Sequence, residues 1–231
     1  MTIWAIVPAA GIGRRMRAKV PKQYLNLNGR PIIETSLARI GSLNYVRQIA
    51  VMINPDDTVW PTLGLEKNPK IVCQFGGENR YQSVLYGLRY LKSQAQDDDW
   101  VLVHDAARPC VRRKDIDNLF EQIADHPVGG LLGAPVDNTM KLVDESQEIV
   151  ATVDRVNVWS AFTPQAFRFR LLLDALEAVD KSEKTVTDEA TAVEGLGHRP
   201  KMVLGNRDNI KITHPDDLGL AAQILSAQAM E

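Results

Sequence analysis

The chain has 231 residues, 27 lysines and arginines against 29 aspartates and glutamates, and a formal net charge of -2. Such a balance lacks the basic excess of nucleic-acid-binding proteins, so we expect no nucleic-acid partner. No basic segment followed by an apolar run opens the chain, and no stretch approaches the roughly 18 apolar residues of a membrane span, so we expect no signal peptide and no membrane partner. Cys73 and Cys110 lack CxxC spacing, which favours free thiols and a cytoplasmic location.

Short apolar runs alternate with helical patterns through most of the chain. Strands are predicted at Ile3–Pro8, Gln48–Ile53, Ile71–Phe75, Trp100–His104 and Gly130–Val136, and helices at Pro31–Ile40, Tyr81–Gln96 and Lys114–Asp125. Strands that are apolar on both faces suit a sheet covered by helices on each side. The alternation therefore favours an α/β fold, with a three-layer, mostly parallel sheet in one domain over residues 1–231. Ligands of such folds bind beyond the carboxyl ends of the strands.

Residues 137–159 break this alternation. Two short extended runs, Thr139–Val143 and Glu148–Val153, flank a polar turn and predict a β-hairpin. A lone hairpin is barely stable, so we expect this arm to pack against something, and a second copy of the chain is one candidate. Later elements are predicted as helices at Arg168–Asp180 and near Thr187–Gly195, strands at Lys201–Leu204 and Ile210–Ile212, and a closing helix from Pro215.

The loop after the first strand has the composition of a phosphate-binding turn. Its small residues are Pro8, Ala9, Ala10, Gly11 and Gly13. Successive backbone N–H groups there can hold an anion, and Arg14, Arg15 and Lys22 add positive charge. The GxxxxGK[ST] motif and the third glycine of the dinucleotide fingerprint are both absent. The alternative is a tight turn with solvated arginines, but the run Pro21–Leu25 holds Lys22 between a proline and an aromatic residue, which favours a functional role.

Two further loops follow predicted strands. Gly77, Glu78 and Ser83 open a helix, where glycines permit close approach to a flat base; the alternative is a helix start with a solvent-facing serine. Asp105 follows the next strand and is a candidate ligand for Mg²⁺, which takes one or two carboxylates and otherwise phosphates and water. The alternative for Asp105 is a turn cap paired with Arg108.

Three late positions each have a simple structural alternative. Thr163 and Thr187 both lie just before predicted helices, in patterns typical of helix caps. Lys211 lies between two isoleucines and therefore faces the opposite side of a short strand, either as a phosphate ligand or as an ordinary edge-strand lysine.

Several of these motifs together resemble a known family. Pro-Ala-Ala-Gly-x-Gly-x-Arg-Met from Pro8, Pro-Lys-Gln-Tyr from Pro21, His-Asp-Ala-Ala-Arg-Pro from His104, and Asp-Arg-x-x-x-Trp from Asp154 resemble the methylerythritol-phosphate cytidylyltransferase family of the nucleotidyltransferases. The resemblance extends from Pro8 to Thr213, although Asn138 stands where the family has Asp. It implies a Rossmann-like fold and transfer of a cytidylyl group from CTP to a polyol phosphate, with Mg²⁺ as cofactor, by a homodimer.

The resemblance also implies roles for individual residues. Arg15 and Lys22 would stabilise the transition state. Gly77, Glu78, Ser83 and Ala106 would join the first loop in binding the nucleotide. Asp105, Arg108, Thr163 and Thr187 would line the substrate pocket. Thr139 and Arg155 would reach from the hairpin into the acceptor site of the neighbouring subunit, and Arg155 and Lys211 would bind the acceptor phosphate.

Two other functions remain open at this point. One is cytidylyl transfer to another polyol phosphate, such as ribitol 5-phosphate, which would share the CTP half of the site. The other is a nucleotide-binding module without turnover, which would not need Arg155 and Lys211 to meet at a second phosphate. A dinucleotide oxidoreductase is disfavoured by the incomplete glycine fingerprint.

Overall fold

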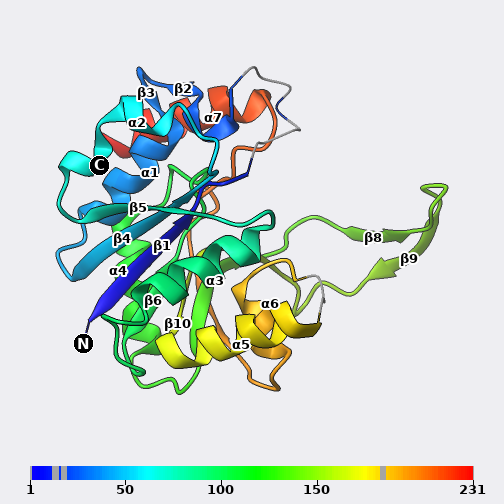
Figure 1. Cartoon of the computed structure of the whole chain (residues 1–231). Coiled ribbons are helices and arrows are strands. Elements are labelled where there is room, and N and C mark those ends of the chain that lie inside the picture. The colour runs from blue at the N-terminus through cyan, green and yellow to red at the C-terminus, as the bar shows by residue number, and fades with distance from the viewer. Residues whose placement is uncertain (1, 12–15, 17–19, 183–185, 231) are drawn as a thin grey trace.

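The computed structural model describes residues 2–11, 16, 20–182 and 186–230, and it is built around a seven-stranded sheet (Figure 1). The strands are β1 (Ile3–Pro8), β4 (Val46–Ile53), β5 (Ile71–Phe75), β6 (Trp100–Val103), β7 (Gly129–Pro135), β10 (Trp159–Arg168) and β11 (Lys201–Leu204). Their order is β11-β7-β10-β6-β1-β4-β5. Strand β10 runs antiparallel to β6 and β7, and the other neighbours pair in parallel, so the predicted mostly parallel sheet is confirmed.

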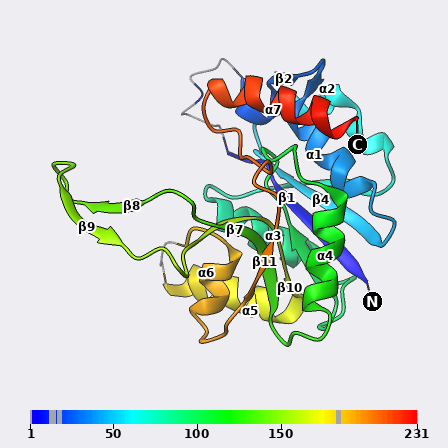
Figure 2. The ribbon, with the colours of Figure 1, turned by 180° about the vertical axis from the view of Figure 1, so that it is seen from behind.

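Helices cover both faces of this sheet (Figures 1 and 2). The elements α1 (Ile32–Gly41) and α4 (Arg113–Ile123) pack on one face, and α3 (Arg80–Leu91), α5 (Phe169–Ser182) and α6 (Glu189–Glu194) pack on the other. Strand β1 explains the two cores, because side chains alternate along a strand: Ile3, Ala5 and Val7 join one core, whereas Trp4 and Ile6 join the other. The predicted three-layer architecture is therefore confirmed.

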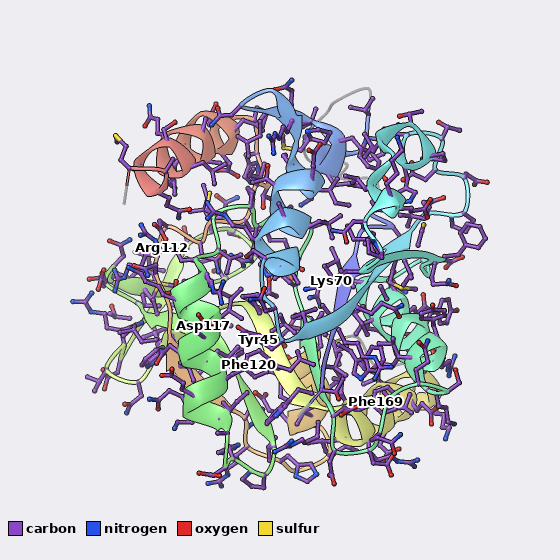
Figure 3. All side chains as sticks on the ribbon, turned by 90° about the vertical axis from the view of Figure 1, so that its left-hand side faces the viewer. Tyr45, Lys70, Arg112, Asp117, Phe120 and Phe169 are labelled. Carbon is purple, nitrogen blue, oxygen red and sulfur yellow. The ribbon has the colours of Figure 1, made fainter. Side chains whose placement is uncertain are left out.

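Smaller elements complete the body. They are α2 (Trp60–Leu63), the paired strands β2 (Asn26–Leu27) and β3 (Arg30–Pro31), 3₁₀ turns at Lys22–Tyr24 and Leu65–Lys67, and the closing helix α7 (Asp216–Gln228). Tyr45 ties α4 to the start of β4, since its ring stands edge-on to Phe120 at 5.8 Å and its hydroxyl donates to Asp117 at 2.5 Å (Figure 3). Among the described residues, none of the helices has the length and apolar character needed to cross a bilayer.

The predicted hairpin is present as an arm that projects from the body in both views (Figures 1 and 2). It consists of the antiparallel strands β8 (Met140–Val143) and β9 (Ile149–Val153), and every residue of both strands is exposed. The arm leaves the sheet from β7 and returns into β10, whose Trp159 pairs with Pro135. Large apolar side chains remain uncovered on it, with Leu142 56% and Ile149 65% exposed.

Two sequence predictions differ from the structure, and one strand of the main sheet was not predicted. The helix predicted to Gln96 ends at Leu91, whose carbonyl accepts the backbone N–H groups of both Gln94 and Ala95 in a turn. The strand predicted at Ile210–Ile212 does not form, and only the N–H of Ile212 bonds across, to Ala107. Strand β10 was not predicted, because a proline and polar residues interrupt its apolar pattern. Its register with β7 shifts at the same place, between Ala161 and Gln165.

Candidate active site

A cavity of about 350 Å³ opens beyond the carboxyl ends of β1, β5 and β6. Predicted site residues that line it are Pro8, Ala9, Ala10, Gly11, Lys22, Gly77, Glu78, Ser83, Asp105, Ala106 and Lys211. Gln23, Asn79, Arg80, Ala107 and Thr213 line it as well, although the sequence did not single them out. The chain thus brings Lys22 and Lys211 to one cavity, as the phosphate-binding hypothesis requires. Gly13 and Arg15 lie outside the described residues.

The first loop is tied to the turn that carries Lys22. The side-chain amide of Gln23, which is buried, donates to the carbonyl of Ala9 at 2.7 Å. The Nζ of Lys22 donates to the carbonyl of Ile212 at 3.1 Å. Because Ile212 directly follows Lys211, this bond also links the Lys22 turn to the segment that carries the second lysine.

The loop after β5 requires its glycines for packing. A Cβ at Gly76 would lie 2.8 Å from the Cβ of Ala10 and 2.7 Å from the Oγ of Ser83. The N–H of Gly77 donates to that same Ser83 hydroxyl at 3.1 Å. The two loops therefore approach each other more closely than any side chain would allow, and the buried Ser83 holds the second loop in place.

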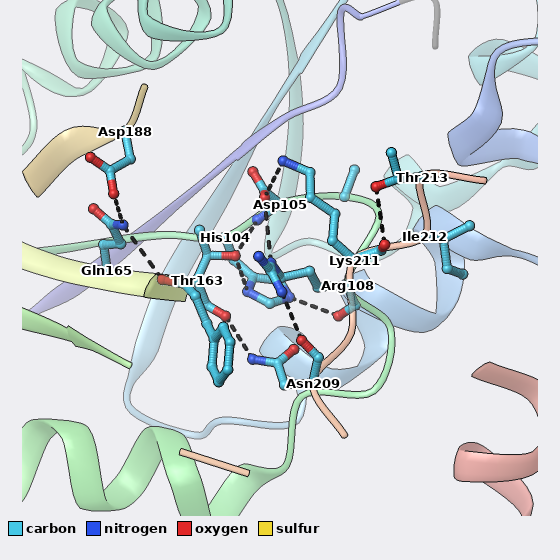
Figure 4. A network of polar contacts seen from close by, with 12 residues as sticks. His104, Asp105, Arg108, Thr163, Gln165, Asp188, Asn209, Lys211, Ile212 and Thr213 are labelled. Atoms are coloured by element: carbon cyan, nitrogen blue, oxygen red, sulfur yellow. Dashed lines mark hydrogen bonds and ion pairs between the residues drawn. The ribbon is translucent and has the colours of Figure 1, made fainter. Parts of the chain in front are cut away.

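Asp105 is the centre of charge in the cavity (Figure 4). Its Oδ1 lies 2.9 Å from the Nε of Arg80, and its Oδ2 lies 2.8 Å from the Nζ of Lys211 and 3.5 Å from the Nε of Arg108. Burial raises the pKa of the Asp105 carboxyl, but the charges of Arg80, Lys211 and Arg108 outweigh burial and hold that pKa well below its usual range. The carboxylate therefore stays ionised throughout the physiological pH range.

His104 acts as a neutral packing residue beneath this carboxylate. Its Nε2 lies 3.0 Å from the carbonyl of Arg108, so Nε2 must carry the proton. Its Nδ1 then accepts from the Thr163 hydroxyl at 3.3 Å, and that hydroxyl oxygen accepts the backbone N–H of Asp105 at 3.0 Å. Complete burial lowers the pKa of His104 to about 4, which keeps the ring uncharged at neutral pH.

Arg80 and Glu189 form a pair that sequence reasoning missed. Two guanidinium nitrogens of Arg80 bind the two carboxylate oxygens of Glu189, at 2.7 and 3.1 Å, while its Nε binds Asp105. The side chain of Glu189 is fully buried. Burial lowers the pKa of Arg80, but the charges of Glu189 and Asp105 more than offset this and raise it. No pattern in the sequence points to this contact, since the partners are 109 positions apart.

Five predicted residues do not line the cavity. Arg108 lies behind Asp105, and its guanidinium donates to the carbonyl of Asn209 at 2.7 Å. Thr163 is buried within β10 rather than in a loop before a helix, and there it supports Asp105. Thr187 is exposed beside α6, where its hydroxyl contacts that of Thr191 at 3.1 Å. Thr139 and Arg155 are exposed on the arm.

The single carboxylate of Asp105 fits a divalent cation whose other ligands are phosphate oxygens and water. In the part of the chain that the structure describes, no three His, Cys, Asp or Glu side chains come together as a metal cage. Mg²⁺ characteristically takes one or two carboxylates together with phosphates and water. Oδ2 of Asp105 already holds an ammonium group at the cavity, so an anionic oxygen is placed where such an ion could bind.

Comparison with known proteins assigns the family. The family model of 2-C-methyl-D-erythritol 4-phosphate cytidylyltransferase (IspD) matches residues 3–227. The proteins of that name from Hahella chejuensis and Vibrio vulnificus are 48% and 46% identical, over 95% and 97% of this chain and 91% and 94% of their own. The crystal structure of the Francisella tularensis protein of that name superposes with a TM-score of 0.86 at 37% identity, and the match covers 97% of this chain and 100% of the other. This chain belongs to the 2-C-methyl-D-erythritol 4-phosphate cytidylyltransferase family.

Proposed function

We propose that this chain transfers the cytidylyl group of CTP to 2-C-methyl-D-erythritol 4-phosphate, giving 4-diphosphocytidyl-2-C-methyl-D-erythritol and pyrophosphate in non-mevalonate isoprenoid synthesis. The observation that carries the proposal is the meeting of Lys22 and Lys211 at one cavity with the glycine-containing loops of β1 and β5. A reaction that joins two phosphoryl groups needs positive charge from both sides of the new bond.

The nucleotide half of the site is formed by the first two loops. In the proposed complex the base lies against Gly77 and Ser83, both of which line the cavity. The triphosphate follows the backbone N–H groups after Pro8 and the charge of Lys22, together with Arg15 from the family resemblance. As the acceptor attacks, negative charge grows on the oxygens of the α-phosphorus, and these fixed cations stabilise it.

The acceptor itself supplies the nucleophile. Its phosphate is largely a dianion at neutral pH, since the second pKa of a phosphate monoester is about 6. One phosphate oxygen forms a bond to the α-phosphorus, and the bond from that phosphorus to the β-phosphate oxygen breaks, with pyrophosphate leaving with the electron pair. No covalent enzyme intermediate and no general base are needed, so the residues act mainly by positioning and charge.

The acceptor site is completed in a homodimer. Lys211 lines the cavity of its own subunit, whereas Thr139 and Arg155 are exposed on the projecting arm, as expected if they enter the site of a second copy. The exposed apolar side chains of β8 and β9, Leu142 and Ile149 among them, would be covered by the same association.

Mg²⁺ is the proposed cofactor, held by Asp105 on the protein side. When bound, it would neutralise charge on the triphosphate. The chain's own part is to keep the Asp105 carboxylate ionised and aimed at the cavity, which Arg80, Arg108 and the Thr163 hydroxyl support. A cytoplasmic location stays a prediction.

The test is pyrophosphate release from CTP with a panel of acceptors. We expect 2-C-methyl-D-erythritol 4-phosphate to be used at a far higher kcat/KM than ribitol 5-phosphate or erythritol 4-phosphate. Preference for ribitol 5-phosphate would show instead that this chain is a cytidylyltransferase for that acceptor. CTP binding without pyrophosphate release from any acceptor would favour the non-catalytic module.

A further inference from the structure

Asp105 has two oxygens with different surroundings. Oδ1 binds only the Nε of Arg80 among the described contacts, and Arg80 is itself held by both oxygens of the buried Glu189. Oδ2 faces Lys211, a single ammonium group at 2.8 Å on a side chain that is 35% exposed, while the Nε of Arg108 lies farther from it, at 3.5 Å. A guanidinium that is fixed by three hydrogen bonds holds its position, whereas a flexible amine can leave. The two oxygens therefore differ in how readily they change partners.

Glu189 is anchored independently of Arg80. The next residue, Ala190, donates its N–H to the side-chain carbonyl of Gln165 at 2.9 Å. The amide nitrogen of Gln165 donates to Asp188 at 2.8 Å (Figure 4). Asp188 also caps α6 by accepting the N–H of Thr191 at 2.9 Å. The side chain of Gln165 thus holds the start of α6 to β10 by two hydrogen bonds.

These contacts close a ring around Asp105. Its backbone N–H is held by Thr163 of β10, and its side chain is held by Arg80, which is held by Glu189. Glu189 opens α6, and α6 returns to β10 through Gln165. The backbone of Asp105 is thus held directly by β10, and its Oδ1 is held to the same strand through Arg80, Glu189 and α6.

We propose that Arg80 and Glu189 are positioning residues for cytidylyl transfer, which immobilise Oδ1 of Asp105 so that Oδ2 is the oxygen that exchanges its partner in the cavity. This proposal rests on the proposed function and concerns how Asp105 is held in that same site. Glu189 is fully buried and so acts only through Arg80. Misplacing a reacting group by about 1 Å can cost about 10²-fold in rate. Removing the partner of a metal-binding side chain typically costs about 10–100-fold in metal affinity.

The main test variant is Arg80→Met with Glu189→Leu, which removes both charges together and leaves no lone buried ion. Glu189→Gln and Arg80→Lys are made beside it. Lysine keeps the positive charge, but a single ammonium cannot bind Asp105 and both oxygens of Glu189 at once. If charge alone were required, Arg80→Lys would behave as the wild type; we expect it to be defective.

Two readouts are measured on each purified variant. The first is kcat and KM for CTP in pyrophosphate release, where we expect kcat to fall by about 10–100-fold with little change in KM. The second is the Mg²⁺ concentration that half-saturates CTP binding in calorimetry, without acceptor, which we expect to rise by about 10-fold or more. Thermal unfolding reports stability separately, since a purely structural role would lower Tm and leave both readouts unchanged.

Arg89→Met with Asp180→Leu is the matched control. This pair also joins α3 to a neighbouring helix, at 3.4 Å, but it does not line the cavity. We expect wild-type kinetics from it. Wild-type kcat and Mg²⁺ dependence in the Arg80→Met, Glu189→Leu protein would overturn the proposal, as would failure of all three test variants to fold. A wild-type enzyme that releases no pyrophosphate would instead refute the proposed function, and the calorimetric titration would still test the pair.

Discussion

The Nζ of Lys211 lies 2.8 Å from Oδ2 of Asp105, so the lysine proposed for the acceptor phosphate is paired with the carboxylate proposed for the metal. Each of the two groups therefore satisfies the other while substrates are absent. An acceptor phosphate would compete with Asp105 for Lys211, and a divalent ion would compete with Lys211 for Asp105. The two halves of the site are coupled through this one ion pair.

Replacing Lys211 with Met should weaken use of the acceptor. A hydrogen bond to a charged group contributes about 1.5–3 kcal/mol, so KM for the acceptor should rise by about 10–100-fold while CTP binding changes little. Steady-state pyrophosphate release at varied acceptor concentration measures this. Lys201→Met is the control, since Lys201 bonds Gln122 away from the cavity. An unchanged acceptor KM in the Lys211 variant would remove Lys211 from the acceptor site.

Replacing Lys22 with Ala should lower kcat by roughly 10²–10³-fold, as removal of one fixed donor from a transition state does. Lys70→Ala is a matched control, because Lys70 also donates to a backbone carbonyl, that of Leu43 at 3.1 Å, but lies outside the cavity (Figure 3). Both variants lose a lysine that bonds to the backbone, and only the first should lose turnover. Normal turnover by folded Lys22→Ala protein would refute the catalytic assignment.

Replacing Thr163 with Val should affect both stability and rate. The backbone N–H of Asp105 would lose its acceptor in a buried place, which costs about 1–3 kcal/mol of unfolding free energy. Urea unfolding measures that loss, and pyrophosphate release should fall because Asp105 shifts. Thr163→Ser retains the hydroxyl and should restore most of the rate. Equal behaviour of the Val and Ser variants would mean that the hydroxyl has no part in holding Asp105.

Replacing Gly76 with Ala should weaken CTP binding. The added Cβ would lie 2.8 Å from the Cβ of Ala10, so the two nucleotide loops must move apart. Overpacking of this kind costs about 1–3 kcal/mol, which predicts about 10-fold or more weaker CTP binding in calorimetry. Gly219→Ala is the control, since nothing lies within 4 Å of a Cβ there. Full CTP affinity in the Gly76 variant would show that the loops tolerate separation.

Alkaline pH should destabilise the fold partly through Cys110. Burial raises the pKa of its thiol to about 12, against 9.0 for the unfolded chain. Below pH 9 the thiol is protonated in both states and contributes no pH dependence. From pH 9 to about 12 only the unfolded state releases the proton, so the free energy of unfolding falls by about 1.4 kcal/mol per pH unit. Thermal unfolding from pH 8 to 10.5 should show a shallower decline for Cys110→Ala; parallel curves would contradict this.

Much of the sheet can be read from local sequence. The bounds predicted for β1, β5 and β11 are those observed, because each is a short apolar run between turn residues. Asp105 was predicted from its place after β6, since loops at the carboxyl ends of parallel strands share one edge of the sheet. Such elements depend on neighbouring residues alone, so a single sequence is enough to locate them.

The supports of the site depend instead on distant contacts. Strand β10 contains a proline and polar residues, and only its pairing on both sides with β6 and β7 makes it a strand. Thr163 was therefore assigned to a loop, and its bond to Asp105 was not foreseen. Arg80 and Glu189 are separated by 109 positions, and their surroundings resemble ordinary helix starts. Lys211 lines the cavity although the strand predicted to carry it does not form.

If two copies associate through the arm that leaves β7 and re-enters at β10, their contact acts on the polypeptide that also supports the site. A neighbour that bound this hairpin would act on strand β10, which carries Thr163 and Gln165. Substitutions at the tip of the arm would then alter turnover from a distance, and in such a dimer dissociation on dilution would change how closely Asp105 keeps its position.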